Sequence, residues 1–463
     1  MSKTARFTRC LFFGIVALVA AASEAAAQRK PNILVIVGDD MGYGDIGVHG
    51  AHDLATPHID ALARTGVRCT NGYVSGPYCS PTRAGLMTGR YQQRYGHEFN
   101  PGAASRADKT FGLPLTEPTL VERLRGAGYA TGMVGKWHLG DESEFHPVRR
   151  GFGFYFGFLG GAHSYLDAKA DPANPILRGT ASVNEPEYLT DAFRREALAF
   201  IESHQKESWL LCLTFNAVHN PMHATGKYLD RFPQIQDERR RTYAAMMAAM
   251  DDAIGAVVAR IAQLGLEENT LIFFISDNGG PVVNGSSNGP LRGYKAQTWE
   301  GGIRVPFLVR WKGRLPAGKL YDQPVIQLDI LPTALAVAGV ELRPDWKLDG
   351  VDLLPHLEGR VSKAPHSALY WRFAQHMAIR MGDWKLVKAP DGPTPELRRR
   401  TAEDDATGAR LFNLAVDIGE KTDLAQREPE KVKAMAAAWK AWNAELAEPR
   451  WFGNRLQPPP SAK

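Results

Sequence analysis

Two pairs of oxygen-bearing side chains stand where predicted β-strands end. Asp39 and Asp40 follow one apolar run of strand length, and Asp277 and Asn278 follow another. In an open α/β sheet, ligands bind at the carboxyl ends of the strands. Adjacent carboxylates repel each other, and carboxylate and amide oxygens suit Ca²⁺ or Mg²⁺ better than Zn²⁺. One such pair alone is most simply a turn or a helix cap, but two pairs favour a cation site.

Cys79 opens a helix-like stretch in which Arg83 follows one turn later. Free N–H groups and the helix dipole favour anionic oxygen at such a position. Further polar side chains that could handle charge or protons are Lys136, His138, His219 and Lys295. Taken singly, Arg83 and Lys136 are equally well interpreted as structural ion-pair partners, and His138 as a core histidine.

The segment 79–90, CSPTRAGLMTGR, resembles the signature of the type I sulfatase family, C-x-P-x-R followed by T-G-R. Similar segments follow in the family's order: GYATGMVGKWHLG at 128–140, FNAVHNP at 215–221, Lys295 with WEGGIRVP at 299–306, DGVD at 349–352 and GDWKL at 382–386. One C-x-P-x-R match would be weak, whereas several segments matched in order are specific. The resemblance runs from Asn32 to about Leu424. Thr82 departs from the Ser or Ala that many relatives carry at this position. The family's pattern tolerates any residue there, so the departure bears only on how efficiently Cys79 is modified after synthesis.

The resemblance implies that Cys79 is oxidised to Cα-formylglycine by a formylglycine-generating maturation enzyme. A thiol itself suits sulfate-ester chemistry poorly, because sulfur attacking sulfur gives an intermediate with no easy exit. An aldehyde hydrate offers two hydroxyls, one to attack the ester sulfur and one to expel sulfate afterwards. Covalent catalysis of this kind divides one difficult displacement into two steps.

The resemblance also implies a role for each polar residue. Ca²⁺, with Mg²⁺ as the alternative, would be held by Asp39, Asp40, Cys79, Asp277 and Asn278. Negative charge on the sulfuryl oxygens would be stabilised by Arg83, Lys136 and Lys295. His138 would take a hydroxyl proton during sulfate release, and His219 with Lys295 would protonate the leaving oxygen.

Residues that select the substrate are harder to predict. His163 is the candidate for a polar contact to substrate and Ser164 the alternate, although a plain loop histidine is an equally good interpretation. Glu98 and Asn100 are better interpreted as parts of a structural turn. A small C-terminal unit could line the pocket through Trp371, Arg372 or His376.

The composition is that of an ordinary globular protein. Of 463 residues, 44% are hydrophobic and 23% charged, which excludes a disordered or collagen-like chain. The net charge of +5 suits an anionic small substrate. Basic runs occur only at 239–241 and 398–400, so nucleic-acid binding is not predicted.

The first 27 residues have the three parts of a secretory signal peptide. Basic residues precede an apolar run at 10–22, and small residues follow at 25–27. The run is too short to span a bilayer comfortably, so we expect an exported protein, periplasmic or secreted, without a membrane anchor. Removal of the leader leaves Cys69, Cys79 and Cys212, an odd number that predicts one unpaired thiol.

The elements that must position these residues follow from the apolar pattern. Runs of strand length occur at 32–37, 130–134, 209–215, 271–275 and 305–311. Helical patterns lie between them, the longest at 238–264 and another opening at 116–118. Continuous apolar strands that alternate with helices predict a large, mainly parallel sheet sandwiched by helices. The resemblance to the sulfatase family further implies that the sheet is mixed and that the fold is alkaline-phosphatase-like.

Beyond residue 360 short strand-like pieces precede one amphipathic helix at about 429–446. This pattern predicts a small antiparallel sheet with a helix on it. The expected organisation is a leader at 1–27, a catalytic α/β domain at 28–360, a C-terminal α+β domain at 361–450 and a tail at 451–463.

Three functions remain open. The first is hydrolysis of sulfate esters, on a sulfated carbohydrate or an aryl sulfate. The second is hydrolysis of phosphonate monoesters or phosphodiesters by an enzyme of the same superfamily. The third is a non-catalytic exported binder of sulfated glycans. The complete GKWHLG and WEGGIRVP segments favour sulfate, and the presence of every expected catalytic residue argues against a binder.

Overall fold

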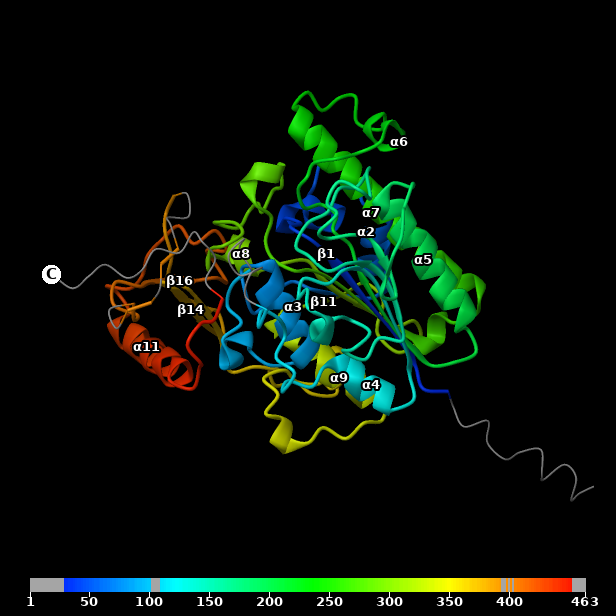
Figure 1. The fold of residues 1–463 in the computed structure, drawn as a ribbon. Coiled ribbons are helices and arrows are strands. Elements are labelled where there is room, and N and C mark those ends of the chain that lie inside the picture. The colour runs from blue at the N-terminus through cyan, green and yellow to red at the C-terminus, as the bar shows by residue number, and fades with distance from the viewer. Residues whose placement is uncertain (1–28, 101–108, 393–396, 399, 402–403, 452–463) are drawn as a thin grey trace, which may run out of the picture.

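A computed structural model describes residues 29–100, 109–392, 397–398, 400–401 and 404–451 (Figure 1). The predicted leader, and the predicted tail apart from Trp451, lie outside the described residues. No helix within these ranges combines the length and the apolar character that crossing a bilayer requires.

A ten-stranded mixed sheet forms the centre of the molecule, with the strand order β11-β2-β10-β9-β1-β8-β4-β5-β6-β7. Its strands are β1 (Asn32–Gly38), β2 (Val67–Cys69), β4 (Ala130–Lys136), β5 (Phe154–Phe158), β6 (Leu177–Arg178), β7 (Ala181–Ser182), β8 (Trp209–Thr214), β9 (Thr270–Ser276), β10 (Phe307–Arg310) and β11 (Lys319–Tyr321). The central strands β9, β1, β8, β4 and β5 all run parallel, and β10 is antiparallel to β9. The predicted large, mainly parallel sheet is confirmed.

Helices cover both faces of this sheet (Figure 1). One face packs against α2 (Pro57–Thr65), α5 (Leu189–Ser203) and α7 (Glu238–Gln263), and the other against α3 (Cys79–Thr88), α4 (Leu120–Gly126) and α9 (Ile330–Val337). Strand β1 shows why both faces are apolar. Leu34 and Ile36 belong to the α7 side, whereas Ile33, Val35 and Val37 belong to the α3 side, as the alternation of side chains along a strand requires.

Helix α4 begins later than the sequence pattern predicts. It starts at Leu120 rather than at 116–118, because Thr119 forms a capping box with Glu122. The Thr119 hydroxyl accepts from the Glu122 amide at 3.1 Å, and the Glu122 carboxylate accepts from the Thr119 amide at 2.7 Å. This reciprocal pair satisfies two N–H groups that the helix itself leaves free.

A second, antiparallel sheet follows near the C-terminus, with the order β13-β14-β15-β16. Its strands are β13 (Leu369–Phe373), β14 (His376–Met381), β15 (Trp384–Lys388) and β16 (Arg410–Asn413). Helix α11 (Pro429–Asn443) lies beside this sheet (Figure 1). It packs on the sheet through Met435, Trp439 and Trp442. The predicted small sheet with one helix is confirmed, and the boundary at 360/361 stays a prediction. Shorter elements are β3 (Gly72–Tyr73), β12 (Val325–Ile326), α6 (Gly226–Leu229), α8 (Glu300–Ile303) and α10 (Leu354–Leu357).

A buried ion-pair cluster joins the small antiparallel sheet to the start of α8. Lys385 on β15 is fully buried, and its Nζ lies 2.9 Å from Glu300 Oε1 and 2.9 Å from Glu420 Oε1. Glu300 also accepts from the Tyr73 hydroxyl at 2.7 Å. Burial opposes ionisation of Glu300, but Lys385 and then Arg304 outweigh it and lower its pKa to about 2. Glu300 opens α8, five residues after Lys295, so this cluster anchors a segment of the predicted site.

We expect Lys385→Met to destabilise the protein by about 3–5 kcal/mol, because two buried carboxylates lose their shared cation. Urea unfolding followed by tryptophan fluorescence measures the loss. The control is Lys433→Met, the same change at an exposed position of α11, which should stay within about 0.5 kcal/mol of the parent. Equal stability of the two variants would contradict a joining role for Lys385.

Candidate active site

The parallel pairing of β1 and β9 brings the two predicted acidic pairs together. Gly38 lies opposite Ser276 at the ends of these strands, so the next residues of both strands are neighbours. The Asp40 amide donates to Asp277 Oδ1 at 3.2 Å, and Asn278 Nδ2 donates to Asp40 Oδ1 at 2.7 Å. Asp39, Asp40, Asp277 and Asn278 are all almost completely buried.

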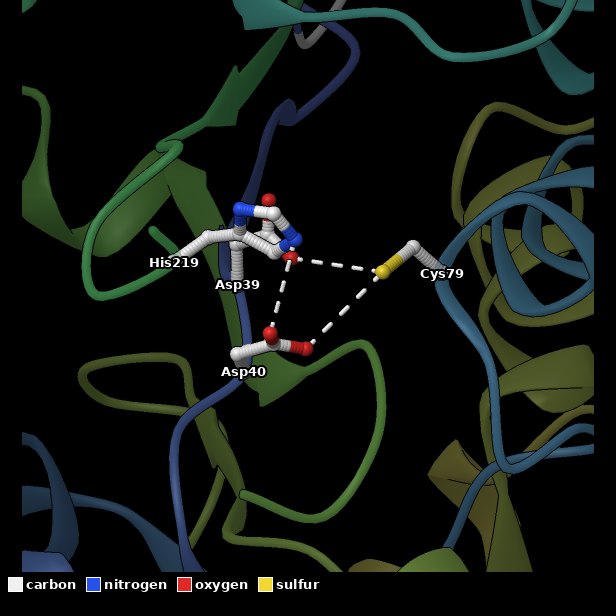
Figure 2. A group of neighbouring side chains, drawn as sticks. All are labelled: Asp39, Asp40, Cys79 and His219. Carbon is white, nitrogen blue, oxygen red and sulfur yellow. Dashed lines mark hydrogen bonds and ion pairs between the residues drawn. The ribbon is translucent and has the colours of Figure 1, made fainter. Parts of the chain in front are cut away.

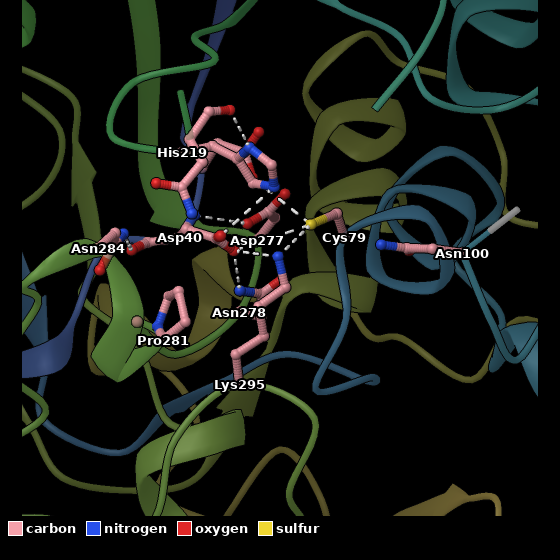
Figure 3. A network of polar contacts seen from close by, with 12 residues as sticks. Asp40, Cys79, Asn100, His219, Asp277, Asn278, Pro281, Asn284 and Lys295 are labelled. Atoms are coloured by element: carbon pink, nitrogen blue, oxygen red, sulfur yellow. Dashed lines mark hydrogen bonds and ion pairs between the residues drawn. The ribbon is translucent and has the colours of Figure 1, made fainter. Parts of the chain in front are cut away.

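Asp40 adopts a left-handed backbone conformation with φ of 60°. Non-glycine residues rarely adopt it unless their surroundings impose it. Here Asn284 Nδ2 donates to the carbonyl of Asp40 at 3.3 Å and to that of Val218 at 3.1 Å (Figure 3). Asn284 was not among the predicted site residues, because no motif marks it. It nevertheless holds the main chain that carries Asp40.

Cys79 is the first residue of α3 and is completely buried. Its Sγ lies 3.5 Å from Asp39 Oδ1 and 3.9 Å from Asp40 Oδ1 (Figure 2). It also lies 3.2 Å from Lys295 Nζ (Figure 3). Burial, followed by the charge of Asp277, raises the pKa of the thiol far above its usual value. The unmodified side chain is therefore a protonated thiol at neutral pH, and the thiolate is the reactive form of cysteine.

Three cationic side chains balance the three carboxylates. Lys136 Nζ contacts Asp39, and Lys295 Nζ lies 2.6 Å from Asp40 Oδ1. Arg83 donates to Asp277 Oδ2 from Nη2 at 2.8 Å and from Nε at 3.0 Å. The cations come from α3, from the end of β4 and from the segment before α8. The structure thus gathers all the predicted charged residues at one edge of the sheet.

The three carboxylates differ in how well nearby positive charges stabilise their ionised forms. Burial opposes ionisation of Asp40, but Lys295 and then His219 outweigh it and hold its pKa below the usual range. Burial and the charge of Asp39 raise the pKa of Asp277 to about 6 in spite of Arg83. An additional positive charge between Asp39 and Asp277 would therefore stabilise their ionised forms.

Both predicted catalytic histidines are at this edge. His219 Nε2 lies 3.5 Å from Asp40 Oδ2, while Nδ1 donates to the Asn220 carbonyl at 2.6 Å, an assignment that rests on hydrogen bonding. Burial lowers the pKa of His219 to about 4. Burial and then the charge of Lys136 lower the pKa of His138 well below its usual value. Both rings are neutral at pH 7, and a bound anion would raise both pKa values.

The residues predicted to select substrate border this site without entering the charged cluster. The His163 ring packs against Phe158, and its Nδ1 lies 2.8 Å from the Ser164 carbonyl. Its Nε2 is buried without a hydrogen-bond partner among the described residues. Ser164 Oγ instead accepts from the Asp167 amide at 3.1 Å and closes a turn. The same segment reaches the site at Gly161, where an added Cβ would lie 2.7 Å from His138 Nε2.

The other candidate residues make contacts within the protein. Glu98 accepts from Arg372 Nε at 2.9 Å in a buried ion pair. Asn100 Oδ1 accepts from the Ser80 amide at 2.9 Å in the first turn of α3. Trp371 donates its indole N–H to the Val74 carbonyl at 2.7 Å. Trp371 and Arg372 therefore make contacts within the protein.

The donor set fits a hard divalent cation. Ligand atoms of Asp39, Asp40, Cys79 and His219 lie within 4.8 Å of one another (Figure 2). Asn278 Oδ1 is buried and has no hydrogen-bond partner among the described residues. This oxygen is therefore available to coordinate a cation. Carboxylate and amide oxygens are the ligands that Ca²⁺ and Mg²⁺ prefer. His219 belongs to this group of neighbours, although the sequence analysis gave it a proton-transfer role.

A second acidic group, separate from this cluster, consists of His58, Asp251 and Asp252. Asp251 accepts from the His58 and Ile59 amides at the start of α2, at 3.1 and 2.8 Å. That carboxylate is used as a helix cap.

The cysteines Cys69, Cys79 and Cys212 are all buried and free. The sequence predicted one unpaired thiol, whereas the described part of the chain has three.

An acidic, oxygen-rich edge faced by a helix N-terminus and three cations suits an anionic ester, and the fold around it is that of the alkaline phosphatase superfamily. The family model "Sulfatase" matches residues 31–340, and a model described as "N-sulphoglucosamine sulphohydrolase, C-terminal" matches residues 294–390. The chain belongs to the sulfatase family and is a type I sulfatase. It is therefore a sulfuric ester hydrolase.

Relatives of known name cover most of the chain. N-acetylgalactosamine-6-sulfatase of Sus scrofa is 35% identical over 394 residues, 80% of this chain and 74% of the relative. Arylsulfatase J of Mus musculus is 31% identical and covers 92% of this chain and 78% of its own length. The solved structure of Ps i-CgsB in complex with k-i-k-neocarrahexaose matches with a TM-score of 0.84 at 35% identity, covering 92% of this chain and 95% of that one.

We expect Ca²⁺ to stabilise protein that has been stripped with a chelator, because a dication relieves the repulsion among the buried carboxylates. At a Ca²⁺ concentration about 100-fold above Kd, the gain is about 2.7 kcal/mol, measured by urea unfolding with and without Ca²⁺. Asp277→Asn should remove most of this gain. The matched control Asp251→Asn, at the other acidic group, should retain it, and an equal loss in both variants would place the cation elsewhere.

Proposed function

We propose that the protein removes sulfate from a sulfated carbohydrate or an aryl sulfate, using Cα-formylglycine made from Cys79 and a bound divalent cation. The observation that carries this proposal is the place of Cys79. It opens α3 inside an intact signature and lies against Asp39, Asp40 and Lys295. Its raised thiol pKa argues against catalysis by the unmodified side chain.

The cation, Ca²⁺ or alternatively Mg²⁺, would be held by oxygen atoms of Asp39, Asp40, residue 79, Asp277 and Asn278. When bound, the aldehyde hydrate and the cation supply a nucleophilic oxygen and Lewis-acid stabilisation of negative charge. The carboxylates are at present neutralised by Arg83, Lys136 and Lys295. Carboxylates that share a dication would leave these three side chains free to stabilise the sulfuryl oxygens, because the total charge then favours an anion.

The two histidines would move protons. His138 is neutral, and its Nδ1 has no partner among the described residues, so it can take a proton during sulfate release. His219 presents Nε2 toward Asp40 and lies on the solvent side of the site, with 20% of its side chain exposed. A bound sulfate ester would raise the pKa of His219. The protonated ring would then donate from Nε2 to the leaving oxygen, together with Lys295, whose pKa Asp40 raises in spite of burial.

Substrate contact is proposed for His163, with Ser164 as the alternate. The first choice is supported by Nε2 of His163, which has no hydrogen-bond partner among the described residues, whereas the turn closed by Ser164 Oγ weakens the second. The names of two relatives, an N-acetylgalactosamine-6-sulfatase and a protein bound to a neocarrahexaose, support a sulfated carbohydrate, and the name of a third, an arylsulfatase, supports the alternative of an aryl sulfate. We further propose export through the leader at 1–27, to the periplasm or the medium, and modification of Cys79 by a formylglycine-generating enzyme.

Tryptic mass spectrometry of the active protein should find an aldehyde at position 79. Cys79→Ala should lose turnover of 4-nitrophenyl sulfate while unfolding at the temperature of the parent, because it deletes the nucleophile and a small buried side chain only. The control Cys212→Ala removes a buried thiol from the middle of β8 and should retain the aldehyde and the activity.

The same preparation distinguishes sulfate from phosphonate chemistry. We expect a higher kcat/KM on 4-nitrophenyl sulfate than on a phenylphosphonate ester. The reverse order would reject sulfate as the natural ester, and full activity with an unmodified thiol would reject the proposed nucleophile.

His219→Ala should lower kcat about 10²- to 10⁴-fold on a sugar sulfate and much less on 4-nitrophenyl sulfate. A nitrophenolate leaves without a proton, whereas a sugar alkoxide needs one. Steady-state kinetics on both substrates measures the difference, and His204→Ala, at the end of α5, serves as the control with unchanged kinetics. Equal losses on both substrates would remove the role of general acid from His219.

A further inference from the structure

We propose that His97 and Ser80 are positioning residues that hold His138 in its working orientation through a chain of two hydrogen bonds. This inference rests on the proposed role of His138. It assigns a function to two residues that lie outside the charged cluster. The two hydrogen bonds link the segment after α3, the first turn of α3 and the loop after β4.

His138 needs to be held because its main chain is in the left-handed region, with φ of 61°. Its amide donates to the Leu159 carbonyl at 2.9 Å. Its carbonyl accepts from the Ser80 hydroxyl at 2.6 Å. The ring packs against Gly161, where no Cβ fits. A backbone in so rarely populated a region persists only when the surroundings impose it, and such residues cluster at active sites.

The second hydrogen bond fixes the tautomer of His97. Ser80 Oγ lies 2.7 Å from His97 Nε2 as well as 2.6 Å from the His138 carbonyl. A hydroxyl has one proton to donate. If that proton pointed to His97, two oxygens would face each other at 2.6 Å with no proton between them. The hydroxyl therefore donates to the His138 carbonyl and accepts from His97, which must carry its proton on Nε2.

The surroundings of His97 preserve that state. The ring is completely buried, and the rings of Phe111 and Trp451 lie 5.5 and 5.3 Å away. Burial and the charge of Arg450 lower the pKa of His97 to about 3, so the ring stays neutral. The Ser80 amide is fixed separately by Asn100 Oδ1. Ser80 directly follows Cys79, so the chain of hydrogen bonds sets His138 relative to residue 79.

A matched pair of variants tests this inference. The amide nitrogen of glutamine can take the place of Nε2, whereas that of asparagine falls near Nδ1. His97→Gln should therefore keep the donor to Ser80, and His97→Asn should lose it. Kinetic constants are expressed per aldehyde-bearing molecule, counted by mass spectrometry. We expect His97→Asn to lower kcat about 10- to 100-fold with KM nearly unchanged, and His97→Gln to restore most of it.

A readout independent of turnover comes from histidine-selective ¹⁵N NMR of the full chain carrying Cys79→Ala. We expect a neutral His97 ring protonated at Nε2 that does not titrate across the neutral range. The His138 resonances, assigned with His138→Ala, should move in His97→Asn and stay in place in His97→Gln. Ser80→Ala, examined in the same way, gives the same test if His97→Asn does not fold.

The outcomes separate this inference from the proposed function. Adding His97→Asn to His138→Ala should cost nothing further, because residues that act as a unit are not additive. A His97 ring protonated at Nδ1, or unmoved His138 resonances in His97→Asn, would overturn the positioning role. Unchanged kcat in His138→Ala would instead reject the proposed role of His138 itself.

Discussion

Three buried carboxylates at the ends of two adjacent parallel strands are the constraint on which the rest of this structure depends. Asp39, Asp40 and Asp277 would repel one another strongly in so dry a place if no positive charge were near. The fold supplies that charge from three separate elements: Arg83 from α3, Lys136 from β4 and Lys295 from the segment before α8. The elements that carry these cations must therefore all converge on one edge of the sheet.

This balance of charge also explains what the site can do. In this cluster the charges of the three carboxylates and the three cationic side chains cancel. A dication bound to the carboxylates would add positive charge, and the cationic side chains could then bind a sulfate group. The raised pKa of Asp277 shows where further positive charge is favourable, as does Asn278 Oδ1, which has no hydrogen-bond partner in the described part of the chain. The sulfate-ester chemistry of the family and the electrostatics of this edge are consistent with each other.

Much of the fold could be predicted because its signals are local and strong. Continuous apolar runs indicated the central strands, and the short strand-like pieces after residue 360 indicated the small antiparallel sheet. The meeting of Asp40 with Asp277 was predictable because both end parallel strands. The start of α4 was predicted too early, because the capping box of Thr119 and Glu122 outweighs a proline nearby.

The supporting parts of the site could not be predicted in this way. Asn284 reaches Asp40 across 244 positions, and Lys385 meets Glu300 across 85. Nothing local to these residues indicates their partners, since only the folded chain brings them together. The same holds for His97, whose ring reaches Ser80 around the end of α3. Motifs identified the reacting groups, whereas the groups that hold them emerged from packing.

A crystal structure of the mature protein grown with Ca²⁺ tests the central claim most directly. The account predicts oxygen in place of sulfur at residue 79 and one cation about 2.3–2.6 Å from oxygens of the four acidic and amide ligands. A cation bound elsewhere, or an intact thiol at residue 79 in protein that turns over sulfate esters, would contradict it.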